Sequence, residues 1–221
     1  MSGQERWVDV REGLRVEEVD GFCYLGDVLA ARGGTMEAVR ARVRCGWAKW
    51  RELAPFLLRK EVPLSLKGRV YDTCVRRAML YGSETWAMGT REDRMLDRAE
   101  MRMLRWMAGI SLRDGRSNEW VRNLMRVEAV GEVARRGRLR WYGHVERMDD
   151  GCWIRKCRDL VVEGKRPRGR PRKTWEGALQ EDMRKAGLRR EDARDRDRWR
   201  SMLVKIRPTP VIQGRRPLKR I

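Results

Sequence analysis

Apolar residues recur every three or four positions over a long stretch of this sequence, and no other feature limits the possible fold as much. The stretch runs from Met36 to Ile110, with interruptions near Pro63 and Gly82. This spacing places the apolar side chains on one face of an α-helix. We therefore expect three successive amphipathic helices that pack as a small bundle. The expected apolar faces consist of Met36, Val39, Val43, Trp47, Trp50, Leu53 and Leu57 in the first helix, Leu66, Val70, Cys74, Ala78 and Tyr81 in the second, and Leu96, Ala99, Met103, Trp106 and Ile110 in the third.

Capping residues set the expected starts of the helices. Serine and threonine favour the N-cap position because their side-chain oxygen accepts a hydrogen bond from the first helical turn. Residues 16–29, by contrast, are rich in strand-forming residues and are expected to be extended. We therefore expect a mainly α protein with a short strand and turn at its N-terminus. The expected N-caps are Thr35, Ser65, Thr90, Ser117 and Thr174. A last helix is expected to carry the apolar residues Trp199, Met202, Leu203 and Ile206.

The positive charge of the chain is concentrated toward its C-terminus. The chain has 52 lysine and arginine residues against 32 aspartate and glutamate residues, a net charge of +20. Residues 1–134 hold 24 basic and 20 acidic residues, a net charge of +4, whereas residues 135–221 hold 28 and 12, a net charge of +16. An asymmetry of this size favours nucleic acid as the partner, bound mainly through its phosphates. An anionic membrane surface is the weaker alternative, because the basic segments contain many glycines and few apolar stripes.

Other classes of protein are disfavoured by the sequence. No run of about 18 apolar residues is present, so we expect no transmembrane helix. The polar start from Ser2 to Arg6 is unlike a secretory signal. No small-molecule substrate is expected, because phosphate-binding glycine loops, nucleophile elbows and zinc-protease motifs are missing. The expected location is intracellular, in the nucleus or in both nucleus and cytoplasm. Reduced thiols are expected at the five scattered cysteines, Cys23, Cys45, Cys74, Cys152 and Cys157.

The sharpest local signal is the segment 164–173, Gly-Lys-Arg-Pro-Arg-Gly-Arg-Pro-Arg-Lys. Six of these ten residues are basic, and the two prolines and two glycines exclude a regular helix. Residues 168–171, Arg-Gly-Arg-Pro, resemble the AT-hook, a motif that lies extended in the minor groove of A·T-rich DNA. A narrow minor groove concentrates negative potential and attracts arginine. The alternative interpretation is a solvated linker that is rich in arginine like the residues around it.

Two clusters contain metal-binding residue types, but each has a simpler interpretation. His144, Cys152 and Cys157 supply three ligands at an unusual spacing, so we favour structural packing over a zinc site. Asp149 and Asp150 resemble the paired aspartates of polymerases, but they precede a glycine in an arginine-rich region. We therefore expect them in a surface turn.

Tryptophan is abundant in this chain, which contains ten such residues. Tryptophans on the expected apolar helix faces, including Trp106, are expected to anchor the core. Trp141 and Tyr142 lie next to Arg138 and Arg140 in the sequence. They could therefore stack on bases or sugars, and burial is the alternative.

Several short motifs occur in an informative order. They are Phe-Cys-Tyr-Leu-Gly at 22–26, Lys67 and Tyr71, Leu-Tyr-Gly-Ser-Glu-Thr-Trp at 80–86, Leu-Arg-Trp at 104–106 with Gly109, Leu-Arg-Trp-Tyr-Gly-His-Val-Glu-Arg-Met at 139–148, Gly-Arg-Pro-Arg-Lys-Thr-Trp at 169–175 and Asp-Arg-Trp at 197–199. In this order they resemble the C-terminal part of the reverse transcriptase of non-LTR (LINE-like) retrotransposons. The resemblance extends over residues 16–205.

The resemblance implies a layout for the chain. The turn at 22–26 resembles the end of the palm, which helps to hold the primer end near the active site. The helices from Met36 to Ile110 resemble the thumb, which grips the template–primer duplex, and the region beyond 117 resembles the segment that binds the element's RNA or the target DNA. The expected units are a residual palm-end strand and turn at 1–34, a thumb-like helical bundle at 35–116, a basic helical nucleic-acid-binding module at 117–207 and a disordered basic tail at 208–221.

The same resemblance implies which residues bind. The expected primer-grip-like residues are Phe22, Tyr24, Leu25 and Gly26. The expected nucleic-acid contacts are Lys67, Arg69, Arg76 and Arg77 in the thumb-like bundle, and Arg138, Arg140, Arg166, Arg168, Arg170, Arg172 and Lys173 in the basic module.

One departure from the family changes the expected function. In the family, a metal-binding Tyr-x-Asp-Asp motif precedes the Phe-x-Tyr-Leu-Gly turn, but only 21 residues precede Phe22 here and none of them matches. Without those carboxylates the two-metal site cannot assemble. We therefore expect a truncated reverse transcriptase remnant that binds template–primer or target nucleic acid without catalysis. No cofactor is expected in this chain, whereas the complete parent enzyme would use Mg²⁺.

The sequence is compatible with two other functions. The first alternative is an AT-hook-like architectural or regulatory DNA-binding protein, which would prefer A·T-rich duplex. The second is an active metal-dependent enzyme that uses Asp149 and Asp150, and it is the least favoured. The sequence leaves the oligomeric state open.

Overall fold

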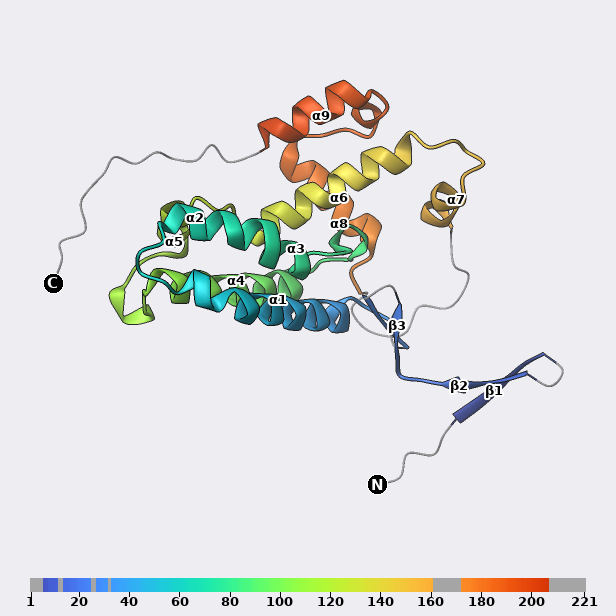
Figure 1. The fold of residues 1–221 in the computed structure, drawn as a ribbon. Helices are drawn as coiled ribbons and strands as arrows, with labels where there is room; N and C mark the ends of the chain where they lie inside the picture. The colour runs from blue at the N-terminus through green and yellow to red at the C-terminus, as the bar shows by residue number, and fades with distance from the viewer. Residues whose placement is uncertain (1–5, 12–13, 25–26, 32, 161–171, 207–221) are drawn as a thin grey trace.

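The computed structural model describes residues 6–11, 14–24, 27–31, 33–160 and 172–206, and the expected mainly α fold is confirmed (Figure 1). The expected tail at 208–221 and residues 164–171 of the basic segment lie outside the described residues. The elements are β1 (Arg6–Arg11), β2 (Leu14–Glu18), β3 (Gly21–Tyr24), β4 (Asp27–Ala30), α1 (Met36–Leu57), α2 (Leu64–Val70), the π-helical η1 (Tyr71–Val75), α3 (Arg76–Met79), the 3₁₀ turn η2 (Ser83–Thr85), α4 (Thr90–Ala108), the 3₁₀ turn η3 (Leu112–Asp114), α5 (Asn118–Met125), α6 (Val130–Glu146), α7 (Trp153–Asp159), α8 (Trp175–Ala186), the 3₁₀ turn η4 (Glu191–Ala193) and α9 (Arg196–Lys205).

Two antiparallel hairpins precede the helices. Strand β1 pairs with β2, and β3 pairs with β4. The first hairpin projects away from the helical body (Figure 1), and the side chains of β2 are exposed on both faces. The second hairpin lies closer, because β4 packs on α1 and the indole Nε1 of Trp86 donates a hydrogen bond to Asp27 Oδ2 (3.2 Å). A two-stranded hairpin is only marginally stable by itself, so the contact with Trp86 anchors the second hairpin.

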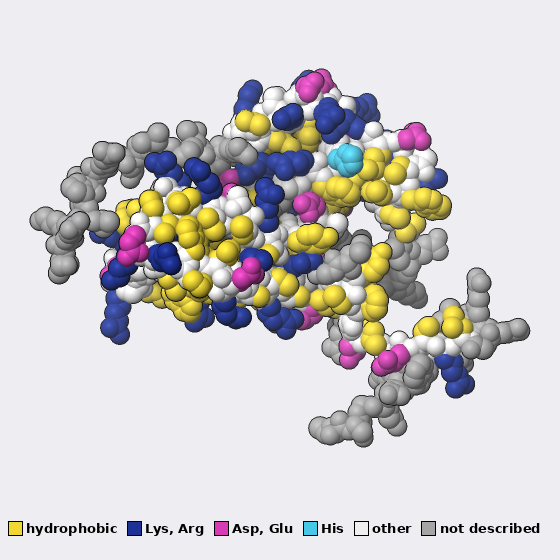
Figure 2. Space-filling model, viewed as in Figure 1, with side chains coloured by type: hydrophobic (Ala, Val, Ile, Leu, Met, Phe, Trp, Pro, Cys, Tyr) yellow, Lys and Arg dark blue, Asp and Glu magenta, His cyan; other side chains and the backbone are white. Residues whose placement is uncertain are grey.

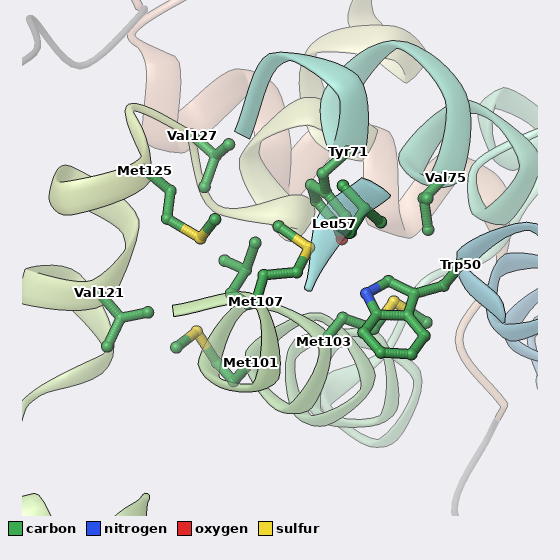
Figure 3. Packing of buried hydrophobic residues seen from close by; sticks show 11 residues of the cluster. Trp50, Leu57, Tyr71, Val75, Met101, Met103, Met107, Val121, Met125 and Val127 are labelled. Carbon is green, nitrogen blue, oxygen red and sulfur yellow. The ribbon is translucent and has the colours of Figure 1, made fainter. Parts of the chain in front are cut away.

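The first hydrophobic cluster lies between α1, α2, η1, α4 and α5. Figure 3 shows Met107 of α4 between Met125 of α5 on one side and Trp50 of α1 on the other. Much of the packing is by methionine, whose flexible thioether side chain fills irregular gaps between helices. Helix α5 contributes to this cluster, although the sequence assigns residues from 117 onward to the C-terminal unit. The buried members are Trp50, Leu57, Tyr71, Val75, Met101, Met103, Leu104, Met107, Val121, Met125 and Val127.

The second expected helix is rotated by about one residue from the expectation. It forms α2, η1 and α3 in succession, and Tyr71, Val75 and Met79 face the interior. Cys74 and Tyr81, which we expected on the inner face, are exposed. The apolar pattern gave the wrong face because the buried face includes charged residues and a glycine.

Gly68 is the glycine on this buried face. A Cβ atom built on it would lie 2.0 Å from the backbone oxygen of Met125 at the end of α5. No side chain fits in that space, so glycine allows the backbones of α2 and α5 to approach each other closely.

Two further clusters complete the interior. The second lies beside the first, where Val39 of α1, Met79 of α3 and Leu96 of α4 pack around Trp86. The third joins α6, α8 and α9, and it includes Leu139, Tyr142, Leu179, Met183, Leu188, Ala193, Trp199 and Leu203. The described C-terminal helices therefore have a hydrophobic core of their own.

Buried polar contacts connect this C-terminal core to the bundle. Arg138 Nε of α6 donates to Asp182 Oδ2 of α8 (2.7 Å), and its Nη1 donates to the backbone oxygen of Trp86 (2.7 Å). The indole Nε1 of Trp175, at the start of α8, donates to the backbone oxygen of Glu84 (2.8 Å). The acceptors of these hydrogen bonds, Trp86 and Glu84, lie in η2 or next to it. This short turn therefore connects the C-terminal core to the bundle.

Within the C-terminal core, α6 and α9 come into very close contact. A Cβ atom on Gly143 would lie 2.2 Å from Trp199 Nε1. The same indole nitrogen donates to the backbone oxygen of Leu139 (3.1 Å), and the Trp199 and Tyr142 rings meet edge to face at 6.1 Å. Because Gly143 has no side chain, the surface of α6 leaves space for the Trp199 indole of α9.

Candidate nucleic-acid interface

Three of the expected phosphate contacts are buried, which corrects the expectation from sequence. Lys67, Arg76 and Arg138 are each 3% exposed. Lys67 Nζ donates to the backbone oxygen of Met107 (3.1 Å), and burial lowers the pKa of Lys67. Arg138 joins α6 to α8, as described above. Because these side chains face the interior, they support the fold and do not meet a phosphate on its surface.

Arg76 belongs to a buried ionic cluster around Glu100. Arg76 Nη2 donates to Glu100 Oε1 (2.8 Å), and Glu100 Oε2 accepts from Arg122 Nε (3.0 Å) and from the backbone N–H of Val130 (3.1 Å). Burial alone would lower the pKa of Arg76, but the charge of Glu100 raises it overall, so Arg76 remains charged. The cluster thus joins α3, α4, α5 and α6 through one carboxylate.

Three other expected contacts, Arg69, Arg77 and Arg140, are exposed. No ion pair involves them within the described part of the chain. They stay predictions of phosphate contacts.

Arg172 and Lys173, at the end of the basic segment, are exposed but form contacts within the protein. Arg172 Nη1 donates to the backbone oxygen of Gly33 (3.1 Å), and Lys173 Nζ forms an ion pair with Glu181 of α8. Hydrogen bonds from Lys173 and Lys185 lower the pKa of Glu181 to about 2. The remaining expected contacts of this segment, Arg166, Arg168 and Arg170, lie outside the described residues.

The expected primer-grip-like residues lie on the second hairpin. Phe22 and Tyr24 of β3 are 57% and 56% exposed. Phe22 pairs in register with Leu29, and Tyr24 pairs with Asp27. Leu25 and Gly26 lie outside the described residues.

Many arginines of the C-terminal unit form ion pairs within the protein. Half of the net charge of +16 on residues 135–221 falls on the described residues 135–160 and 172–206, and half falls on 161–171 and 207–221. The pairs are Arg135–Glu132, Arg136–Glu128, Arg138–Asp182, Arg155–Asp150, Arg158–Glu146, Arg190–Glu176 and Arg198–Asp192. Part of the arginine content therefore serves the fold, and a basic composition alone overstates the binding surface.

A row of arginines without such partners lies on the outer face of α4. Arg91, Arg94, Arg98 and Arg102 are all exposed, and their spacing of three or four residues places them on one face of the helix. Within the described residues, no carboxylate forms an ion pair with any of the four. We call these four residues the arginine row. Figure 2 shows Lys and Arg side chains along the lower edge of the helical body, where α1 lies.

The acidic residues of α4 point elsewhere. Glu92 accepts from the backbone N–H of Gly89, Asp97 forms an ion pair with Arg122, and Glu100 is buried. Asp93 lies on the side of α4 that faces Gly131 of α6. The outer face of α4 is therefore purely cationic, and like charges four residues apart on a helix repel one another. A polyanion laid along this face would relieve that repulsion.

Helix α1 extends the cationic surface beside the arginine row. Arg44 and Arg51 of α1 are exposed, and they lie about one helical turn before and after Trp47. The rings of Trp47 and Trp106 are 5.6 Å apart, so this part of α1 contacts α4 directly. Total charge per segment does not reveal this surface, whereas the three-to-four residue spacing of the α4 arginines does.

The residue types that suggested metal chemistry are spread apart. Across the described ranges, no three His, Cys, Asp or Glu side chains are grouped so that they could hold a metal ion. His144 is exposed, with its ring 5.7 Å from that of Trp141. Asp149 and Asp150 are exposed in the connection between α6 and α7, which confirms the expected surface turn.

No helix in the described part of the chain is long and apolar enough to cross a membrane.

Comparison with known proteins points to mobile genetic elements. The chain matches no protein-family model, and it matches no solved structure. It is similar to an uncharacterized transposon-derived protein of Caenorhabditis elegans, with 25% identity over 181 residues. The match covers 76% of this chain and 62% of that protein, so the chain spans less than two thirds of the relative's length. This similarity is consistent with a transposon-related origin for the chain.

Proposed function

We propose that this chain is the thumb and downstream basic part of a transposon-encoded reverse transcriptase, and that it binds template–primer or target nucleic acid. The order of the sequence motifs and the transposon-derived relative support this assignment. The family's polymerase chemistry depends on a Tyr-x-Asp-Asp motif, which these 221 residues do not contain. Binding is therefore the activity that we assign to the chain.

The observation that carries this proposal is the arginine row on α4. Its four exposed guanidinium groups extend over 11 residue steps, from Arg91 to Arg102, which is about 16 Å of helix at 1.5 Å per residue. Phosphates along one strand of DNA are several ångströms apart, so a row of this length meets more than one of them. Arginine also binds phosphate oxygens in a bidentate geometry.

The proposal is tested by measuring binding as a function of salt. We expect the full chain to bind RNA, DNA and a hybrid duplex labelled with a fluorophore, with an affinity that falls steeply as salt rises. Replacing two members of the row, Arg94→Ala with Arg98→Ala, should weaken binding to all three ligands. It should also reduce the slope of log affinity against log salt by about 1 for each phosphate contact that is lost.

A matched control removes two charges that already have partners. Arg40 and Lys49 of α1 are ion-paired with Glu37 and Glu52, respectively. The double variant Arg40→Ala with Lys49→Ala should therefore affect binding less than the row variant does. An affinity of the wild-type chain that does not change between low and moderate salt would rule out the proposal.

A further inference from the structure

An aromatic cluster next to the arginine row carries a second kind of binding group. The rings of Trp47, Trp50 and Trp106 lie 5.4 to 5.6 Å apart in edge-to-face pairs. Trp50 is 3% exposed and packs in the first hydrophobic cluster, whereas Trp106 is 50% exposed. The sequence placed Trp106 in the core. Instead, the buried Trp50 ring packs edge to face against the Trp106 ring, and a large part of the Trp106 indole is open to solvent.

Arg102 connects this aromatic surface to the arginine row. Its guanidinium carbon lies 5.3 Å from the centre of the Trp106 ring and 5.8 Å from the centre of the Trp47 ring. Arg102 is itself exposed, and no carboxylate pairs with it within the described part of the chain. The same arginine can therefore remain over an aromatic face or contact a phosphate next to it.

We infer that Trp106, supported by Trp50 and flanked by Arg102, is a stacking site for an unpaired base of single-stranded nucleic acid. The inference rests on the proposed function and specifies which form of nucleic acid this surface takes. Aromatic side chains beside a basic groove are the usual means of binding single strands, because every base has a π-face. In a duplex the faces of the bases are covered by their neighbours, so a surface indole cannot stack on them without unpairing the strand.

The chemistry of the surface favours nucleic acid over an acidic peptide. An acidic peptide would satisfy the arginine row, but it offers no aromatic face to the exposed indole. A single strand satisfies both features, with its phosphates along Arg94 and Arg98 and a base against Trp106. Polyglutamate is therefore the appropriate competitor, and it should displace a single strand poorly.

The test compares two fluorescent probes on the full chain: a single-stranded oligothymidylate of about 12 nucleotides, a length within the usual site sizes, and a duplex of the same length. We expect Trp106→Ala to lower the affinity for the single strand about 5-fold or more, because stacking contributes about 1–3 kcal/mol per base. The affinity for the duplex should not change. Trp106→Phe should retain most of the single-strand affinity, since phenylalanine still offers a ring.

Trp153→Ala is the matched control. Trp153 is 77% exposed on α7 and also has a cation near its ring, with Lys156 Nζ at 5.2 Å. It has no place in the stacking site, so this variant should bind both probes like the wild type. Circular dichroism melts of all the variants establish that each one is folded.

Three results would overturn the inference. Trp106→Ala could leave single-strand binding unchanged, it could weaken single-strand and duplex binding equally, or polyglutamate could compete as well as the oligonucleotide. In each of these cases the proposed nucleic-acid binding would stand, and the assignment of Trp106 would fail. If the wild-type chain bound neither probe, the proposed function itself would fall, and this inference with it.

Discussion

Arg76 and Glu100 form an ion pair that is closed off from solvent, with 2.8 Å between Arg76 Nη2 and Glu100 Oε1 and at most 3% exposure of either side chain. The hydroxyl of Tyr71 donates to the same carboxylate oxygen (3.3 Å). A buried charge is tolerated only when it is paired and hydrogen-bonded. The pair therefore links α3 to α4 through a carboxylate that lies inside the protein.

Removing this carboxylate should strongly destabilise the protein. Glu100→Ala removes the buried carboxylate that pairs with Arg76 and Arg122, and it leaves Arg76 with only the exposed Asp72 as an ionic partner. Breaking a buried pair in this way costs about 3–5 kcal/mol. Asp97→Ala is the comparison, because Asp97 is 42% exposed and pairs with Arg122 near the surface, where the expected loss is about 1 kcal/mol or less. Urea unfolding followed by circular dichroism measures both free energies. Similar losses for the two variants would contradict the structural role of Glu100.

Two glycines of α6 should respond in opposite directions to alanine. Gly143→Ala places a Cβ atom 2.2 Å from Trp199 Nε1, so α9 must shift and the free energy of unfolding should fall by about 1–3 kcal/mol. At Gly137 the nearest side-chain atoms would be 3.8 Å from the new Cβ, an ordinary contact. Gly137→Ala should therefore stabilise the helix by about 0.5–1 kcal/mol. Thermal melts of the two variants provide the measurement, and a stabilising Gly143→Ala would refute the close approach of α6 and α9.

The stability of the protein should fall at alkaline pH through Tyr142. Burial, with the nearby charge of Glu146, raises the pKa of Tyr142 to about 12 from 10.0. Between these two values the unfolded chain loses the phenolic proton while the folded chain retains it. The contribution of Tyr142 is therefore fully present below about pH 10 and is lost as the pH rises toward 12.

Tyr142→Phe isolates this contribution. The Tyr142 hydroxyl is buried and has no hydrogen-bond partner within the described residues, so its removal should cost little at neutral pH. In urea titrations between pH 9 and about 11.5, we expect the variant to lose less stability than the wild type. Parallel pH profiles for the two proteins would show that Tyr142 does not titrate in this way.

The Arg-Gly-Arg-Pro sequence at 168–171 provides a test between the two nucleic-acid functions. If the chain is an AT-hook-like protein, Arg168→Ala with Arg170→Ala should abolish a preference for A·T-rich over G·C-rich duplex. If it is a reverse transcriptase part, the wild-type chain should show little such preference, and the variant should lose affinity for both duplexes alike. Competition between the two duplexes for a labelled probe distinguishes these results.

Local sequence signals predicted the position of most helices. The bounds of α1 and α4 agree with the apolar spacing, and two of the expected caps are confirmed by side-chain bonds: Ser117 Oγ accepts from the N–H of Trp120, and Thr174 Oγ1 accepts from the N–H of Gly177. Thr35 is the N-cap residue of α1 as expected, but its side chain makes no capping bond. Ser65 and Thr90 are not caps, because α2 starts at Leu64 and α4 starts at Thr90 itself. An error of one or two residues at a helix start is expected, since neighbouring residues compete for the cap position.

The binding surface was harder to predict than the fold. Lys67, Arg76 and Arg138 were expected to face phosphates but have partners inside the protein. The buried partners Met107, Glu100 and Asp182 are 24 to 44 residues away in the sequence. A local pattern such as the Arg76–Asp72 pair, four residues apart, therefore does not reveal the burial. Conversely, Trp106 was expected in the core because it lies on an apolar face, but helix α1 offers Trp50 and Trp47 there and leaves its ring half exposed.

The close contact between Gly143 and Trp199 also has an evolutionary consequence. A glycine codon mutates to small residues such as alanine and serine in a single base change, yet each of these would collide with the indole. Replacement of the glycine at position 143 is therefore tolerated best once the tryptophan at 199 has been replaced by something smaller. A change at position 143 should therefore accompany or follow a change at position 199, which lies 56 residues further along the chain.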